Sequence, residues 1–99
     1  APIILKIDLE NENNSELFFD GTELAKENPG NFDGLKVHSS GNIFTTGPNG
    51  ILVLSEEGKL LANIKFKDML TNCALDSDEN YLYVTGFSFV ARIALKSII

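Results

Sequence analysis

The chain has 99 residues, of which 43% are hydrophobic, and this composition is typical of one small globular domain and excludes a disordered segment. Eight basic residues against fourteen acidic ones give a net charge of −6, which opposes binding to nucleic acid or to an anionic membrane because both are polyanions. One cysteine and one histidine exclude an internal disulfide and a structural zinc site supplied by this chain alone.

The sequence contains neither an apolar run of membrane-spanning length nor the layout of a signal peptide at its start. We therefore expect a soluble protein of the cytoplasm or the periplasm, and the sequence does not choose between these compartments. Ala1 is compatible with a natural start, with trimming or with truncation.

Short apolar runs bounded by turn residues follow one another along the chain, which is the signal of β-strands and hairpins. In chain order these runs are IILKIDL, ELFF, GLKVH, IFTTG, ILVLS, LLANIKF, YLYVTG and FVARIAL. Gly58 within SEEGK predicts a tight hairpin turn. Residues 20–30 are the best helix candidate, but Pro29 and Gly30 stop it early, so we expect a loop with at most one helical turn. The predicted class is all-β.

A repeat organises these strands. The run IFTTG at residues 43–47 matches LYVTG at residues 82–86 after a shift of 39 residues. The same shift carries Asp33 onto Asn72. A unit of about 40 residues that contains four short strands is the signature of a β-propeller blade.

We interpret residues 1–30 as the outer two strands of one blade plus a connecting loop, residues 31–70 as a complete blade and residues 71–99 as a partial last blade. The chain then holds about two and a half blades, whereas propellers close with about four to eight. We therefore expect the remaining blades to come from the same longer protein or from other chains. An independent sandwich of about nine strands is the alternative fold.

Two segments, FDGLKVHSSGNIFTTGPNG and TNCALDSDENYLYVTG, resemble the C-terminal part of the gluconolactonase proteins at their mutual spacing. These proteins belong to the family of senescence marker protein 30, gluconolactonase and the luciferin-regenerating enzyme. The resemblance spans nearly the whole chain and implies a six-bladed propeller that binds a divalent cation in its central channel and hydrolyses lactones. Phe32 stands where the family usually has proline, and TGPNG stands where TGPGG is common.

The innermost strand of a blade runs along the channel, so a residue directly before that strand lies at one mouth of the channel. We place Asp33 and Asn72 at this point in adjacent blades, and we expect the turn at residues 47–50 to reach the same face. Carboxylate and amide oxygens suit Ca²⁺, our first choice of cation, with Mg²⁺ or Zn²⁺ as alternatives.

The resemblance makes Asp33 a metal ligand and the candidate catalytic base, while Asn72, Gly47, Pro48 and Asn49 are expected to line the channel and contact substrate. It also implies that the family's N-terminal Glu ligand and its mid-chain Asn ligand would lie before Ala1. Without the resemblance, the Asp-Gly pair would indicate only a turn, and Asn72 only a side chain that caps a turn.

We expect the other candidate side chains to have structural and not catalytic roles. His38 ends its strand at the face opposite Asp33, so we expect a solvated turn residue and not a general base. Cys73 lies between apolar neighbours and is expected to be a buried small hydrophobe. The acidic residues of DSDEN lack the glycine and distal glutamate of a calcium loop, so Asp76, Asp78 and Glu79 are expected to form a solvated turn. We expect Phe87 and Phe89 to pack between blades.

Three functions compete. The first is a metal-dependent lactonase acting on a sugar lactone, the second is a non-catalytic propeller segment that binds or organises other proteins, and the third is an enzyme for another lactone or a phosphoester. An acidic residue at the channel mouth favours the two enzymes. Because two channel groups cannot surround a cation that takes six to eight oxygens, we expect the 99-residue chain alone to be inactive.

Overall fold

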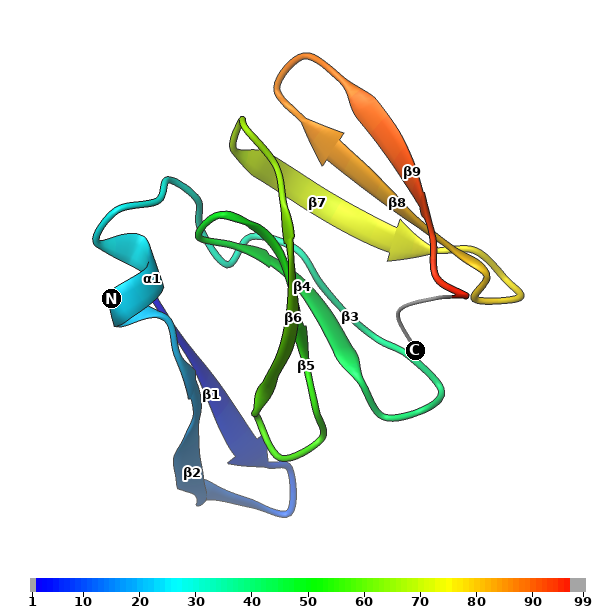
Figure 1. The fold of residues 1–99 in the computed structure, drawn as a ribbon. Coiled ribbons are helices and arrows are strands. Elements are labelled where there is room, and N and C mark those ends of the chain that lie inside the picture. Colours follow the sequence, from blue (N-terminus) through cyan, green and yellow to red (C-terminus); the bar gives the residue numbers. More distant parts are fainter. Residues whose placement is uncertain (1, 97–99) are drawn as a thin grey trace.

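The computed structural model describes residues 2–96, and within them nine strands form three antiparallel sheets (Figure 1). The first sheet is a hairpin of β1 (Ile3–Asp8) and β2 (Asn11–Asp20). The second sheet, in spatial order, contains β3 (Leu35–Val37), β4 (Ile43–Gly47), β5 (Gly50–Leu54) and β6 (Leu60–Lys65). The third contains β7 (Leu70–Leu75), β8 (Tyr81–Gly86) and β9 (Val90–Ala94).

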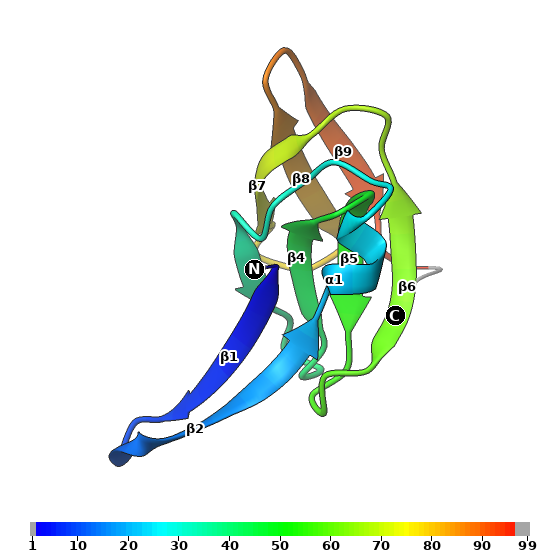
Figure 2. The same cartoon turned by 90° about the vertical axis from the view of Figure 1, so that its left-hand side faces the viewer.

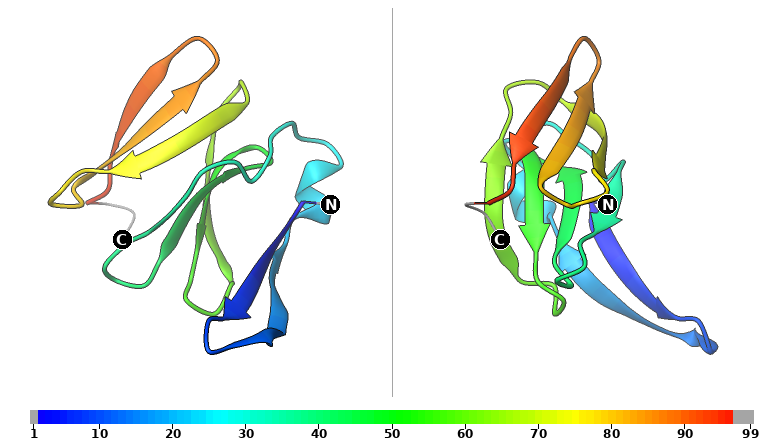
Figure 3. Two further views of the ribbon diagram at one scale, coloured as in Figure 1. Left: turned by 180° about the vertical axis from the view of Figure 1, so that it is seen from behind. Right: turned by 90° about the vertical axis from the view of Figure 1, so that its right-hand side faces the viewer.

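The three sheets lie side by side, with the four-stranded sheet between the two-stranded hairpin and the three-stranded sheet (Figures 1 and 3). The predicted all-β class is therefore confirmed. A single helical turn, α1 (Thr22–Ala25), follows β2 and lies at the open end of the hairpin, as the short candidate at residues 20–30 predicted (Figure 2). Among residues 2–96 no helix has the length and apolarity that a membrane span needs.

The repeat found in the sequence is present in the strand register. Ile43 pairs with Leu54 in the second sheet, and Leu82 pairs with Ile93 in the third, so residues 39 apart occupy equivalent ladder positions. The SEEGK turn forms as predicted, because Gly58 adopts a φ of +85° and its N–H donates to Ser55 O at 3.0 Å.

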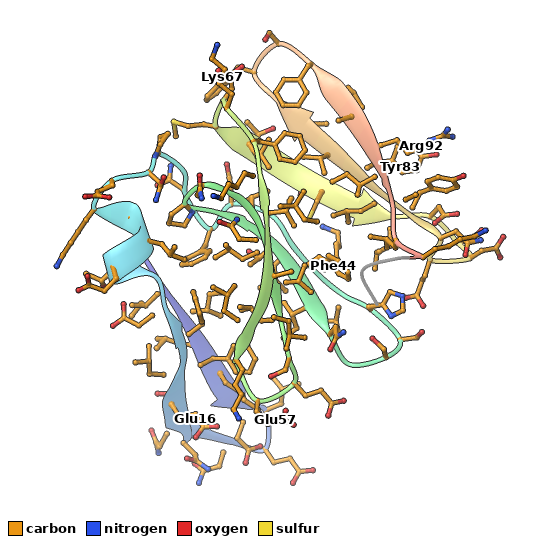
Figure 4. All side chains as sticks on the ribbon, in the orientation of Figure 1. Glu16, Phe44, Glu57, Lys67, Tyr83 and Arg92 are labelled. Atoms are coloured by element: carbon orange, nitrogen blue, oxygen red, sulfur yellow. The ribbon has the colours of Figure 1, made fainter. Side chains whose placement is uncertain are left out.

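The core lies where the second and third sheets face each other. Strands β4 and β5 are buried along nearly their whole length because sheets cover them on both faces, and their sequences accordingly lose the polar alternation of a half-exposed strand. Phe44, fully buried, points from β4 into the space between these sheets (Figure 4). It packs in one apolar cluster with Val53, Cys73 and Leu82.

Candidate functional site

One end of the two larger sheets, which we call the rim, gathers residues 31–34, 47–50, 67–72 and 86–89. Asp33 lies in the loop that leads into β3, with its side chain exposed. Its backbone N–H donates to Thr46 Oγ1 at 3.0 Å, and so does the N–H of Gly34. Among residues 2–96 no hydrogen bond or ion pair engages the Asp33 carboxylate, so its oxygens are available to a ligand.

Asn72 lies at the same end of the third sheet but inside a strand. We expected it directly before the first strand of its blade, and this was wrong: β7 begins at Leu70. The register shifts between Leu70 and Asn72, which leaves Thr71 as the extra residue of a β-bulge. The hydroxyl of Thr71 binds Thr85 Oγ1 at 2.8 Å, so the bulge is held by a side chain that the strand pattern did not reveal.

The amide of Asn72 has a defined orientation. Its Oδ1 accepts a hydrogen bond from the Cys73 N–H at 2.8 Å, and only the oxygen end of an amide can accept that bond. The same oxygen packs against Gly34, where an added Cβ would lie 2.2 Å from it. Among residues 2–96 no hydrogen bond engages the amide nitrogen of Asn72, so its two N–H groups are available as donors. Gly34 follows Asp33 directly, so the structure brings the two predicted residues to neighbouring positions on the rim.

The turn of Gly47, Pro48, Asn49 and Gly50 also lies on the rim, as predicted from the antiparallel register. It is covered by the loop before β3: Asn49 N donates to Pro29 O at 3.0 Å, and Pro48 is fully buried. The Asn49 side chain donates to Asn63 Oδ1 at 2.8 Å. These contacts fix the shape of the turn, and its contact with substrate stays a prediction.

The rim has a hollow of about 480 Å³ between the second and third sheets. Its walls are formed by Pro29, Lys67, Asp68, Met69, Phe87 and Ser88. Lys67 projects from the connection between β6 and β7 (Figure 4). We expected Phe87 to pack between blades, but among residues 2–96 it does not, because it is 79% exposed beside this hollow. Phe89 does pack, with its ring stacked on Phe66 at 6.0 Å.

At the opposite end, His38 is buried, which corrects the expectation of a solvated turn residue. The Ser40 N–H donates to His38 Nδ1 at 3.0 Å, so in the neutral ring the proton is on Nε2. That nitrogen lies 3.6 Å from Glu79 Oε1, at the length of an ionic contact and beyond a good hydrogen bond. Glu79, from the loop after β7, reaches the second sheet beside this ring, and Phe44 lies on the ring as well, with the two centroids 6.1 Å apart.

Glu79 is therefore more than part of a solvated turn. Its carboxylate accepts hydrogen bonds from the side chain and from the N–H of Ser39, and these bonds hold the pKa of Glu79 below its ordinary value. The predicted turn does form, since Glu79 N donates to Asp76 O at 3.0 Å. The Glu79 carboxylate thus links the two larger sheets at the end away from Asp33.

Cys73 is buried, as predicted for a small hydrophobe. Its sulfur faces Gly34 O and Phe44 O at 3.8 Å, and burial raises the pKa of the thiol, which disfavours the nucleophilic thiolate. Cys73 therefore packs where the second and third sheets meet.

Within the described residues no three His, Cys, Asp or Glu side chains gather closely enough to hold a metal ion. The donor chemistry of the rim nevertheless fits a hard cation in part, because the Asp33 carboxylate has no other partner among these residues. Asn72 fits less well as a ligand, since its oxygen already accepts the Cys73 N–H.

The family model for the SMP-30/Gluconolactonase/LRE-like region matches residues 3–88. The chain belongs to this family. Its fold also resembles a solved gluconolactonase from Xanthomonas campestris, described as important in glucose secondary metabolic pathways, with a TM-score of 0.70 and 22% sequence identity. That match covers 82% of this chain and 25% of the gluconolactonase, so the chain spans about a quarter of its length. No curated protein matches the chain.

Family membership and this likeness identify the three sheets as about two and a half blades of a six-bladed β-propeller. Sequence reasoning missed Thr46, whose hydroxyl binds the loop that carries Asp33. The available signal was its place in the repeat, where Thr46 of IFTTG matches Thr85 of LYVTG.

Proposed function

We propose that this chain supplies part of the active site of a metal-dependent lactonase of the gluconolactonase type, with a sugar lactone as substrate. The observation that carries the proposal is the exposed carboxylate of Asp33 on the rim, which no donor among residues 2–96 engages and whose neighbour Gly34 packs against the Asn72 amide. Family membership and the fold of the Xanthomonas campestris gluconolactonase support this class of enzyme.

In this proposal Asp33 has two roles. Its carboxylate would help to hold a divalent cation, Ca²⁺ first and Mg²⁺ or Zn²⁺ as alternatives, and would accept a proton from the water that attacks the lactone. A bound cation would supply polarisation of the lactone carbonyl. The carboxylate can serve in either role because no neighbouring donor among residues 2–96 engages it.

Asn72 contributes through its nitrogen. Because Oδ1 accepts the Cys73 N–H, the two N–H groups of Nδ2 would donate to an oxygen of the sugar lactone. Gly47, Pro48 and Asn49 would form a fixed wall, since their turn is held by Pro29 and Asn63.

The chain would contribute residues 31–70 as a complete blade, residues 1–30 as the outer part of the blade before it and residues 71–99 as a partial last blade. A cation such as Ca²⁺ takes six to eight oxygens, so the other blades would supply further ligands. We therefore expect the 99-residue chain by itself to show no appreciable lactone hydrolysis.

The test is hydrolysis of glucono-1,5-lactone by a closed propeller that contains these residues, followed by pH-stat titration of the acid released. We expect turnover that EDTA abolishes and that added Ca²⁺, Mg²⁺ or Zn²⁺ restores. Parallel assays with other lactones and a phosphoester identify the substrate class. A cation-loaded propeller that hydrolyses none of these would contradict the proposal and favour a non-catalytic binding module.

A further inference from the structure

Thr46 is a fully buried polar residue whose hydroxyl uses its whole hydrogen-bonding capacity on one short segment. Thr46 Oγ1 accepts the N–H of Asp33 and the N–H of Gly34, each at 3.0 Å, and donates to Asn31 O at 3.0 Å. A hydroxyl has one proton and two lone pairs, so these three bonds saturate it. The side chain is therefore committed to residues 31–34 and not merely tolerated in the core.

The segment that Thr46 binds has little regular structure of its own. Residues 31–34 precede β3 and belong to no strand, so no full ladder of backbone hydrogen bonds fixes them. One further bond joins Thr46 N to Gly34 O at 2.9 Å. Thr46 itself lies in β4, a central and buried strand of the second sheet. A rigid strand thus sets the position of the loop that carries Asp33.

The third sheet repeats this arrangement 39 residues later. Thr85 in β8 corresponds to Thr46, and its hydroxyl lies 2.8 Å from Thr71 Oγ1 and 3.5 Å from Asn72 O. In both sheets, then, a threonine of the second strand holds the segment that carries the rim residue. The adjacent Thr45 does something different, because its hydroxyl donates to Thr46 O at 2.8 Å within the same strand.

We propose that Thr46 is a positioning residue, which holds the backbone of Asp33 so that its carboxylate faces the substrate side of the rim. This role rests on the proposed function of Asp33. Thr46 touches neither cation nor lactone and acts only through the peptide groups of residues 31–34. Valine has nearly the same shape but no hydroxyl, so Thr46→Val would leave two N–H groups and one carbonyl without their partner.

The first experiment measures amide hydrogen exchange by NMR in the full chain for Thr46→Val, Thr46→Ser and the matched control Thr45→Val. In Thr46→Val we expect exchange at Asp33 and Gly34 to accelerate by about fivefold or more, the factor for losing one hydrogen bond of ordinary strength. Amides within β5 should exchange as in the wild type. Thr46→Ser keeps the hydroxyl, so it should retain the protection, and Thr45→Val should also retain it.

Unchanged protection of Asp33 and Gly34 in Thr46→Val would overturn the proposal, and so would equal acceleration in Thr45→Val. If Thr46→Val does not fold, Thr46→Ser decides: wild-type protection at both amides supports the hydroxyl's role, whereas loss of protection there contradicts it.

The second experiment measures lactone turnover and Ca²⁺ affinity of the three variants in a closed propeller that contains these residues. We expect Thr46→Val to lower kcat and Ca²⁺ affinity together, by about tenfold, with rescue in Thr46→Ser and little change in Thr45→Val. Loss of kcat in Thr46→Val without rescue by serine would contradict the positioning role. If the wild type has no lactonase activity, the proposed function fails, while the exchange experiment still decides whether Thr46 holds Asp33.

Discussion

Asp33 and Asn72 occupy matching places on adjoining sheets, yet their side chains are committed differently. The Asp33 carboxylate is exposed and engages no donor within residues 2–96, whereas the Asn72 oxygen caps the Cys73 N–H and packs on Gly34. Within the described residues, Asp33 therefore offers acceptor oxygens and Asn72 offers N–H donors. The repeat therefore duplicates the scaffold of the rim but not its chemistry.

The two segments also differ in how they enter their strands. β3 begins at Leu35, after a loop held by Thr46, while β7 already begins at Leu70 and contains a bulge before Asn72. The loop leaves Asp33 outside the ladder of strand hydrogen bonds. Asn72 lies after the bulge but within the strand, and its side-chain oxygen accepts the backbone N–H of Cys73.

The largest expected effect is on Asp33. In a closed propeller, Asp33→Asn keeps the side-chain size but removes the negative charge and the basicity, so turnover should fall by about a hundredfold or more and cation affinity should fall with it. Circular dichroism should stay close to wild type because the side chain is exposed. His38→Asn, at the far end of β3, is the control: its stability should drop, since His38 is buried, but its turnover per folded molecule should not. Full activity of Asp33→Asn would refute the site assignment.

The next largest effect is expected at Gly34, where the two sheets touch. A Cβ at this position would lie 2.2 Å from Asn72 Oδ1 and 2.8 Å from Asn72 Cα, and the latter atom cannot rotate away. Gly34→Ala should therefore lower the free energy of unfolding by about 1–3 kcal/mol in urea titrations. Adding Asn72→Ala should recover only part of this loss. A change below about 0.5 kcal/mol in Gly34→Ala would mean that the sheets are not in this contact.

A smaller effect is expected at Asn72, where one substitution tests whether the side chain acts as a hydrogen-bond donor to the lactone. Asn72→Asp keeps an oxygen for the Cys73 N–H but replaces the free NH₂ by an acceptor. If the NH₂ donates to the lactone, KM should rise by about two- to tenfold, the range for one hydrogen bond, while cation affinity does not fall. Steady-state kinetics and a Ca²⁺ titration measure the two quantities. An unchanged or lower KM would show that the amide nitrogen does not donate to the lactone.

The smallest effect concerns the opposite end of the same two sheets. Hydrogen bonds from Ser39 lower the pKa of Glu79 from its ordinary value of 4.5, despite opposing effects of burial and of Asp76. The resulting stabilisation is present above pH 4.5 and is lost as the pH falls through the lower, folded-state pKa. Urea unfolding between pH 6 and pH 3 should show a modestly weaker acid dependence in Glu79→Gln than in wild type. Asp20, whose pKa is also lowered, is unchanged in both proteins and cancels. Identical pH profiles would rule out this linkage.

The strands, their order and the repeat could be predicted from the sequence because short apolar runs and turn residues act locally. Gly58 in its turn, and the run at residues 43–47 that recurs at residues 82–86 in the equivalent strand, are examples. Burial between sheets could not be predicted in this way. His38 looked solvated because its partner Glu79 lies 41 residues away, and Phe87 looked buried because nothing local shows that its turn projects from the rim.

The candidate site shows the same division: the location of its residues could be predicted, but their hydrogen bonds could not. The repeat and the geometry of a propeller blade located Asp33 and Asn72 at one end of the sheets. The direction of the Asn72 amide, however, depends on the Cys73 N–H, and the position of Asp33 depends on the Thr46 hydroxyl. The Asn72 amide makes one such bond to backbone and the Thr46 hydroxyl makes three, and the repeat shows only that threonine recurs at this position, not what its hydroxyl binds.

The most direct test of the central claim, that Asp33 and not Asn72 provides the cation-binding oxygens, is a Ca²⁺ titration followed by ¹³C NMR in a closed propeller containing these residues. The account predicts a saturable shift of the Asp33 side-chain carboxyl carbon, with the Asn72 side-chain carbonyl carbon nearly unmoved. Saturable Ca²⁺ binding that shifts Asn72 and leaves the Asp33 carboxyl unchanged would contradict it.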